Sequence, residues 1–356
     1  MSKNHLLTFI LPTVFFASSA AAPFSCLPQK DLGVFKTFDR GENWEQKVMI
    51  SKNKTLAQTS ILKIALDPQD SKIVYLGTRG SGLLKSMDGG ELWYSLADRQ
   101  EVLSRQANVI DIAIDPRNSN NLYVGAYQDR YGVMLRSNDA GKHWEEVYRT
   151  ARDRYAVFGV EIDPFDSSLI YMATAEGGLM KSFDFGKTWK TIKWFDDVIT
   201  DLKINSKNSR IIYVSMMTRG VFKTRDQGQN WEKLEGLTGF SEAQNIETLV
   251  LDLKNPETIY TGSKSGFLKS VDGGLTWQKL NILIPPRSLI VQSIALDPTN
   301  SAIIYYAAGN AVYQSQDSGQ SWKMYLINSA SPINTLVVDP ENSQILYAGM
   351  ISDTAY

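Results

Sequence analysis

Short apolar stretches alternate with turn-forming residues along most of the chain, and they recur in a fixed order. The first stretch runs into Asp, as in residues 293–297, and the second carries a tyrosine, as in residues 258–263. The third follows a glycine-containing turn, as in residues 266–270, and the fourth begins at a tryptophan, as in residues 277–280. Such short apolar runs between turn residues are typical of strands, so each unit predicts four short strands.

The first two strands of each unit are joined by a segment of constant spacing. A tyrosine follows eight residues after an Asp that is usually part of Asp-Pro, which presets a turn and needs no N–H donor there. Two copies carry Asn205-Ser206 and Asp252-Leu253 instead and keep the spacing. The tyrosines are Tyr75, Tyr123, Tyr171, Tyr213, Tyr260, Tyr305 and Tyr347.

A second signature lies between the third and fourth strands. It has Ser or Thr two residues before an Asp, Gly two residues after it and Trp five residues after it. Seven of the eight tryptophans belong to this pattern. The pairs are Asp39 and Trp44, Asp88 and Trp93, Asp139 and Trp144, Asp184 and Trp189, Asp226 and Trp231, Asp272 and Trp277, and Asp317 and Trp322.

Each position of this second signature has a structural role that its chemistry predicts. The Asp carboxylate can accept hydrogen bonds from N–H groups that the turn leaves unpaired. The Gly can adopt a positive φ without a Cβ clash, and the Trp can pack between neighbouring sheets. The pattern therefore predicts a structural turn and not a catalytic site.

Four strands at a period of 42 to 51 residues are the signature of propeller blades. Residues 33–44 supply a third and a fourth strand without a first and a second, and residues 333–349 supply a first and a second strand alone. Joined, they complete one blade. We therefore predict an all-β, seven-bladed β-propeller over residues 27–356, with a ring closed by both ends so that no edge strand is exposed at the seam.

The Ser/Thr-x-Asp-x-Gly-x-x-Trp signature resembles the Asp-box, or bacterial neuraminidase repeat, over residues 33–356. This repeat is found in sialidases, the sortilin ectodomain, xyloglucan-cleaving glycosidases and photosystem II assembly factors. The resemblance implies the propeller fold, and it implies that the boxes lie away from the ligand-binding face. We name this signature the Asp-box below.

Composition and charge exclude several classes of site. A net charge of −1 gives no reason to expect a nucleic-acid partner. Two histidines, His5 and His143, and one cysteine, Cys26, cannot supply Cys/His zinc clusters, Cys–His nucleophile pairs or disulfides. We expect a monomer that needs neither a metal nor a cofactor.

Residues 1–26 have the pattern of an export signal, with Lys3, an apolar stretch over residues 6–17 and small residues at 18–22. Cys26 lies where a bacterial lipoprotein would be processed, so we predict an exported protein of the cell envelope that is lipidated at Cys26. Two alternatives remain: an uncleaved anchor, or cleavage within residues 18–22 that leaves Cys26 as a free thiol. With lipidation, the short segment from Cys26 to Gly33, at most about 25 Å when extended, would hold the nearby face at the membrane.

The Asp-boxes and the Asp-Pro turns share one face of a propeller. The opposite face, which we call the loop face, gathers the turns between second and third strands and the connections between blades. These loops vary in length and content, and variable loops on a fixed scaffold are where binding sites tend to lie. The candidate ligand-binding residues are Arg79, Tyr127, Arg130, Tyr131, Arg152, Arg154, Tyr155, Trp194 and Arg219.

Arginine-rich loops suit an anionic or carboxylate-bearing partner, although ordinary solvated loop charges would give the same composition. We predict a non-catalytic scaffold that binds a protein or such a ligand. The alternative is a glycan-binding or glycoside-hydrolysing propeller that pairs carboxylates such as Asp129, Glu176 or Glu242. Against a sialidase, the chain lacks the family's Arg-Ile-Pro motif. Against a xyloglucanase, 356 residues suffice for one propeller and not for two.

Overall fold

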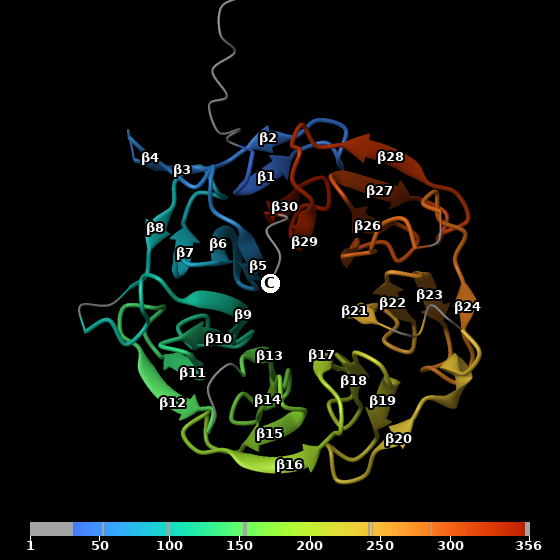
Figure 1. Ribbon diagram of the computed structural model, residues 1–356, viewed down its shortest axis with the longest axis horizontal. Helices are drawn as coiled ribbons and strands as arrows, with labels where there is room; N and C mark the ends of the chain where they lie inside the picture. The colour runs from blue at the N-terminus through green and yellow to red at the C-terminus, as the bar shows by residue number, and fades with distance from the viewer. Residues whose placement is uncertain are drawn as a thin grey trace, which may run out of the picture. The chain divides into compact units, whose positions relative to one another are not determined.

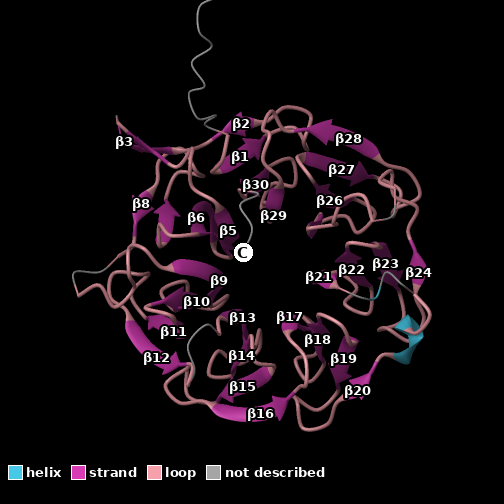
Figure 2. Cartoon of the chain, in the orientation of Figure 1, coloured by secondary structure: helices cyan, strands magenta, loops and turns pink. Residues whose placement is uncertain are grey.

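Seven four-stranded antiparallel sheets make up the described part of the chain, and they are arranged in a ring (Figure 1). The computed structural model describes residues 31–352 except 52, 98–99, 152–154, 241–242, 244 and 286. The predicted signal peptide and Cys26 lie outside the described residues. The all-β prediction is confirmed, since the helical residues among those described are confined to short 3-10 turns such as η1 (Glu235–Leu237), drawn in cyan in Figure 2.

We number the blades I to VII along the chain, with the innermost strand first. Blades I to III are β5 (Ile61–Asp67), β6 (Asp70–Thr78), β7 (Leu83–Ser86) and β8 (Tyr94–Ser95); β9 (Asn108–Ile114), β10 (Leu122–Gln128), β11 (Tyr131–Ser137) and β12 (Glu145–Arg149); and β13 (Val157–Ile162), β14 (Ile170–Thr174), β15 (Gly178–Ser182) and β16 (Lys190–Trp194). Blades IV to VI are β17 (Ile199–Ile204), β18 (Ile212–Met216), β19 (Gly220–Thr224) and β20 (Glu232–Lys233); β21 (Ile246–Leu251), β22 (Ile259–Ser263), β23 (Gly266–Ser270) and β24 (Gln278–Lys279); and β25 (Ser293–Leu296), β26 (Ile304–Ala308), β27 (Ala311–Ser315) and β28 (Lys323–Leu326).

Blade VII closes the ring and joins the two ends of the described chain, as predicted. It consists of β29 (Ile333–Val338), β30 (Leu346–Met350), β1 (Val34–Thr37) and β2 (Glu45–Gln46). β1 pairs with β30 in a register that places Lys36 opposite Tyr347. The seam is therefore a regular antiparallel ladder with no free strand edge.

Two details differ from the sequence prediction. The fourth strands begin one residue after the box tryptophan, as at β8, where Tyr94 follows Trp93. The tryptophan itself still belongs to the turn, and its backbone N–H donates outside the sheet, from Trp93 to the Met49 carbonyl oxygen at 2.9 Å. The connection from blade VII to blade I also forms a two-stranded ribbon, β3 (Met49–Ser51) and β4 (Lys54–Thr55), that the repeat pattern did not predict.

The box residues hold the turns as predicted. In the box of blade V, Ser270 Oγ donates to Asp272 Oδ1 at 2.8 Å and accepts from the Gly274 N–H at 2.9 Å. Asp272 Oδ1 also accepts the Thr276 N–H at 2.9 Å. The glycine two residues after the box Asp has a positive φ in every box, +91° at Gly274. Both predicted roles are therefore confirmed: the carboxylate accepts N–H groups of the turn, and the glycine adopts a positive φ.

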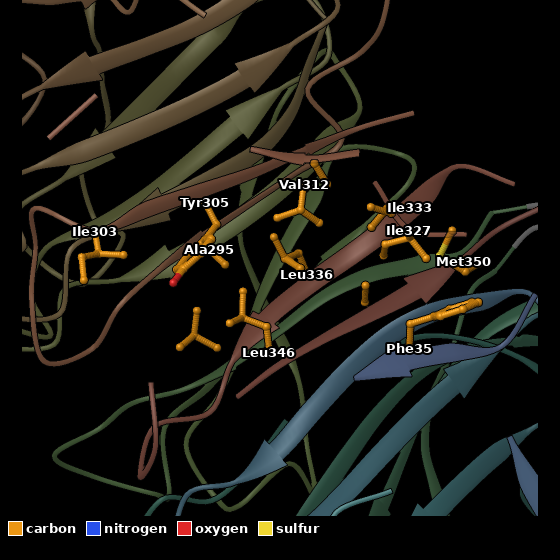
Figure 3. Packing of buried hydrophobic residues seen from close by; sticks show 13 residues of the cluster. Phe35, Ala295, Ile303, Tyr305, Val312, Ile327, Ile333, Leu336, Leu346 and Met350 are labelled. Atoms are coloured by element: carbon orange, nitrogen blue, oxygen red, sulfur yellow. The ribbon is translucent and has the colours of Figure 1, made fainter. Parts of the chain in front are cut away.

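Seven apolar clusters lie between neighbouring blades. Each contains the box tryptophan of one blade and, from the blade before it, the tyrosine that follows eight residues after the Asp-Pro turn or its substitute. Trp93 and Tyr347, for example, are both almost completely buried between blades VII and I. Figure 3 shows the cluster between blades VI and VII, where Tyr305 and Val312 face Leu336 and Leu346. Burial of aromatic side chains at every interface between blades stabilises the closed propeller.

Candidate functional site

Backbone hydrogen bonds place the Asp-boxes and the Asp-Pro turns on the same face. In each blade, the residue after the box Asp donates its N–H to a carbonyl oxygen three residues before the tyrosine, as from Gly273 to Glu257 at 2.8 Å. Because strands alternate in direction, the turns between second and third strands and the connections between blades gather on the opposite, loop face. The seven described candidate residues all lie there: Arg79, Tyr127, Arg130, Tyr131, Tyr155, Trp194 and Arg219. Arg152 and Arg154 lie outside the described residues.

The structure brings three of these residues to neighbouring positions. Tyr155 and Trp194 line one hollow, and Arg219 lines a second and contacts Asp196 of the first, with 3.6 Å between guanidinium and carboxylate. The other four described candidates, in blades I and II, line neither hollow. Among them, the Tyr131 ring is covered by the Arg149 guanidinium at 5.3 Å.

The first hollow, which we call the acidic hollow, lies at the loop-face end of blade III and has a volume of about 380 Å³. Tyr155 and Trp194 form its aromatic wall. Its polar lining consists of three carboxylates, Glu176, Asp196 and Asp197. The sequence predicted arginine-rich loops over this face as a whole, and the charged side chains among the described lining residues of this hollow are acidic.

Trp194 is the one tryptophan outside the boxes, and its side chain is 54% exposed. It ends β16 opposite Gly178 of β15. A Cβ at position 178 would lie 2.9 Å from the Trp194 ring, so glycine there lets the indole lie against the strand. A large aromatic side chain held in this way at the surface is a typical contact residue.

The carboxylates of the acidic hollow differ in what they already bind. Asp197 Oδ2 accepts the N–H groups of Thr218 and Arg219, at 2.7 and 3.0 Å, and the Thr218 hydroxyl at 3.0 Å, so it anchors the β18–β19 turn of blade IV. Glu176 Oε1 is shielded from solvent and has no hydrogen-bond partner among the described residues. Burial, together with the nearby charge of Glu176, raises the pKa of Tyr148.

The second hollow, which we call the basic hollow, occupies the same position on blade IV and has a volume of about 200 Å³. Arg219 and Lys233 supply its positive charge. Leu237 of η1 and Phe240 supply an apolar wall. Two hollows of opposite charge therefore lie on neighbouring blades and meet at the contact between Arg219 and Asp196.

A charged cluster on the innermost strands was missed by the sequence analysis. Lys63 of β5 contacts Asp111 of β9 at 2.7 Å, and Lys203 of β17 contacts Glu161 of β13 at 2.7 Å and Asp201 at 2.9 Å. Burial opposes the charge on Lys203, but Asp201 and Glu161 outweigh it and raise the pKa of that lysine.

Charged residues within otherwise apolar first strands were the available signal for this cluster. Asp111 Oδ2 accepts the Val160 N–H of the next blade at 2.8 Å, and Asp201 Oδ2 accepts the Leu249 N–H at 3.0 Å. These contacts join neighbouring blades near the ring axis, so the cluster has a structural role. Among the described residues, no group of acidic, histidine or cysteine side chains is arranged to hold a metal ion.

Of the carboxylates suggested for hydrolysis, Glu176 lies in the acidic hollow and Asp129 lies in the β10–β11 turn of blade II with φ +51°. Glu242 lies outside the described residues.

No helix among the described residues is long and apolar enough to span a bilayer.

Comparisons with known proteins agree with the boxes and the ring. The family model "Sortilin, neurotensin receptor 3" matches residues 132–239, and that of the "Photosynthesis system II assembly factor YCF48" matches residues 195–347. The chain is an Asp-box seven-bladed β-propeller. It is similar to sortilin-type and assembly-factor-type propellers, and neither match extends over half of this propeller's sequence.

Two kinds of protein are among the similar known structures. A YCF48 structure bound to a D1 peptide has a TM-score of 0.63 and 17% identity over 84% of this chain and 94% of its own. A GH74 xyloglucanase from Xanthomonas campestris has a TM-score of 0.68 and 15% identity over 82% of this propeller and 51% of the enzyme. At these identities the likeness shows the fold alone.

A local sequence match points to the second kind. The xyloglucanase Xgh74A of Acetivibrio thermocellus is 38% identical over 63 residues, which are 17% of this propeller's chain and 8% of the enzyme. The propeller thus spans about half the length of the matched xyloglucanase structure and a small part of this curated relative.

Proposed function

We propose that this propeller is a non-catalytic scaffold that binds a protein partner, through a carboxylate-bearing segment, on its loop face. The observation that carries the proposal is the basic hollow. Arg219 and Lys233 lie there beside the apolar side chains of Leu237 and Phe240. An arginine next to an apolar wall suits a carboxylate on or near an apolar residue, such as the C-terminal end of a peptide.

The likeness to YCF48 supports this choice of partner class. That protein is matched over nearly its whole length, and its structure holds a D1 peptide. The fold is therefore compatible with peptide binding. The ligand class proposed here rests on the side chains of the basic hollow.

The cellular setting is part of the proposal. The sequence of residues 1–26 supports export, and Cys26 supports a lipid anchor in the cell envelope. Gly33, the first residue that we assigned to blade VII, donates its N–H to the Thr59 carbonyl oxygen in the connection to blade I, which belongs to the loop face. A lipid at Cys26 would then hold this face towards the membrane. Metabolic labelling with palmitate, lost in Cys26→Ala, tests the anchor.

A second candidate function is glycan binding or cleavage. The xyloglucanase match and the exposed Trp194 beside three carboxylates favour it. Glycoside hydrolysis needs two free carboxyl groups about 5 to 9.5 Å apart across the sugar. Asp197 is already held by the β18–β19 turn, so such a role would fall to Glu176 and to Asp196, which would have to leave its contact with Arg219.

Paired peptide arrays test the scaffold proposal. We expect wild-type protein to bind a set of free-acid peptides and to lose them when the same peptides are C-terminally amidated. The double variant Arg219→Glu/Lys233→Glu should abolish this binding. The double variant Lys142→Glu/Lys187→Glu makes the same change of charge in two box turns on the opposite face and should leave binding intact.

The enzyme alternative is tested on the same preparations. Turnover of xyloglucan or of reporter glycosides that is lost in Glu176→Gln or Asp196→Asn would favour hydrolysis and contradict a non-catalytic role. Binding of free-acid peptides that does not respond to the Arg219 and Lys233 substitutions would contradict the basic hollow as the site.

A further inference from the structure

We propose that the acidic hollow binds a protonated lysine or arginine side chain of the protein partner, beside the carboxylate held by the basic hollow. This inference rests on the proposed function, since it concerns the same loop face and the same partner. It assigns a ligand class, a single organic cation, to a site that the arginine content of the loops did not suggest.

The charge of the hollow is the first argument. Its described lining contains Glu176, Asp196 and Asp197 and no basic side chain. Arg219 reaches Asp196 from the neighbouring blade at 3.6 Å, and its own charge is shared with the basic hollow. Among the described residues, two positive charges near the hollow, on Arg219 and Lys193, stand against three negative charges, and a cationic ligand would improve the balance.

Glu176 identifies the position that lacks a partner. Asp197 is engaged by the Thr218 and Arg219 N–H groups, and Asp196 by the Arg219 guanidinium. Glu176 Oε1 is shielded from water without a hydrogen-bond donor among the described residues. Leaving a carboxylate oxygen unpaired away from water costs free energy, and a rotation of the Glu176 side chain towards the hollow would expose this oxygen to a donor from a ligand.

The aromatic wall selects an organic cation over a metal ion. Trp194 and Tyr155 line the hollow together with the carboxylates, and ring faces attract ammonium and guanidinium groups without ligating metals. The same segment already shows this contact, since the Lys193 ammonium lies 5.8 Å from the centroid of the Phe195 ring. Carboxylate and indole in one hollow are thus suited to a lysine or arginine side chain.

The position of the two hollows suggests how one segment would occupy both. Each hollow lies between two loops of its blade: the turn that joins the second and third strands, and the connection that leads to the next blade. The acidic hollow belongs to blade III and the basic hollow to blade IV. An extended segment crossing from blade III to blade IV would present a basic side chain first and a carboxylate next. Such paired charges give register as well as attraction.

Indole N–H resonances provide a direct test on the full chain. Trp194 can be assigned by its loss in Trp194→Phe, and the seven box tryptophans serve as internal references. The probe is the tripeptide Ac-Gly-Arg-Gly-NH2, with the same peptide carrying neutral citrulline in place of arginine as its control. We expect the arginine peptide to shift the Trp194 signal in a saturable way, and the citrulline peptide to bind at least tenfold more weakly.

Variants separate the charge of the hollow from its shape. Glu176→Gln keeps the size of the side chain and should weaken the arginine peptide about tenfold. Glu91→Gln removes one negative charge from a box turn on the opposite face and should leave the titration unchanged. Equal shifts with arginine and citrulline, or no effect of Glu176→Gln, would overturn the inference.

The outcomes also distinguish this inference from the proposed function. If free-acid peptides bind through Arg219 and Lys233 but the arginine probe leaves Trp194 unmoved, the basic hollow stands and the acidic hollow is not a cation site. If the arginine probe shifts Trp194 but no free-acid peptide binds, the carboxylate part of the proposed function fails and the cation site remains.

Discussion

The Lys36 ammonium of β1 donates a hydrogen bond to the Gly89 carbonyl oxygen, 2.8 Å away in the box turn of the next blade. The Tyr347 hydroxyl donates to the same oxygen at 3.1 Å. Lys36 also lies over the Tyr347 ring, at 5.1 Å from its centroid. Both residues come from blade VII, so the chain closes its ring with the same lysine–tyrosine pair that joins other blades, such as Lys223 and Tyr213.

Replacing this lysine tests how much the seam contributes to stability. Lys36→Met keeps the length of the side chain and removes the charged donor, and we expect the free energy of unfolding to fall by about 1–2 kcal/mol. Lys323→Met is the matched control, because Lys323 is 62% exposed and pairs with Glu42 at the surface. It should change stability by less than about 0.5 kcal/mol in urea unfolding. Equal effects of both substitutions would contradict a special role for the seam.

The box carboxylates predict how stability depends on acid. The side-chain and backbone donors of Thr276 lower the pKa of Asp272 to about 2, and Thr188 does the same for Asp184. A carboxyl whose pKa is lower in the folded state than in the unfolded state stabilises the fold above its unfolded pKa. That contribution is lost as the pH falls from about 4 towards 2.

Asp272→Asn removes one titrating group while it keeps the shape of the box. We expect the variant to be less stable than wild type at pH 6, with a smaller difference at pH 2.5, where the wild-type carboxylate is increasingly protonated. Urea unfolding at both pH values measures this convergence. A difference that stays constant between them would show that the charge of Asp272 contributes nothing.

Backbone conformation in the boxes predicts substitutions of opposite sign at adjacent residues. Ala140 has φ +60°, a region that costs a residue with a Cβ about 1 kcal/mol, so Ala140→Gly should stabilise the protein by about 0.5–1 kcal/mol. Gly141 has φ +88°, and a Cβ there would lie 2.8 Å from Leu96, so Gly141→Ala should destabilise it by more than 1 kcal/mol. Thermal unfolding of the two variants checks both signs.

Two tryptophans should respond to truncation in different ways. Trp93 is completely buried between blades VII and I, and its indole N–H donates to the Lys47 carbonyl oxygen at 2.9 Å. We expect Trp93→Ala to lower the free energy of unfolding by about 3–5 kcal/mol. Trp194 is half exposed, so Trp194→Ala should lower it by less than about 1 kcal/mol. A large loss of stability in Trp194→Ala would mean that this residue supports the fold.

The sequence alone predicted the ring because its evidence is periodic. Asp272 and Trp277 keep the same spacing as six other pairs, and the incomplete units around Trp44 and Tyr347 complete each other. The positive φ of Ala140 was not predicted, since alanine does not itself favour that conformation, although the glycines at the same box position, Gly89 and Gly273, have it too. In this conformation its N–H donates to the Asn120 carbonyl oxygen.

For the ligand-binding site, the sequence predicted the loop face but not how its residues are arranged there. Trp194 and Tyr155 were named as candidates, but nothing in the spacing placed Glu176 between them or Asp196 beside Arg219. These contacts join loops from different repeats, and repeats differ most in their loops. The periodic signal that determines the scaffold is therefore silent on the arrangement of its binding residues.

The charges near the ring axis give the last prediction. Lys203 contacts both Glu161 and Asp201, and the side chains of all three residues are 23 to 30% exposed. Removing the lysine in Lys203→Met would leave two carboxylates close together without a cation, and we expect a loss of about 2 kcal/mol. The double variant Lys203→Met/Glu161→Gln removes one of these charges and should recover part of that loss, which a double-mutant cycle in urea measures. If the two single substitutions were additive, the contact between Lys203 and Glu161 would not couple blades III and IV. The blades would then be joined by the apolar cluster with Tyr171 and by other contacts, such as that of Lys181 with Gln227.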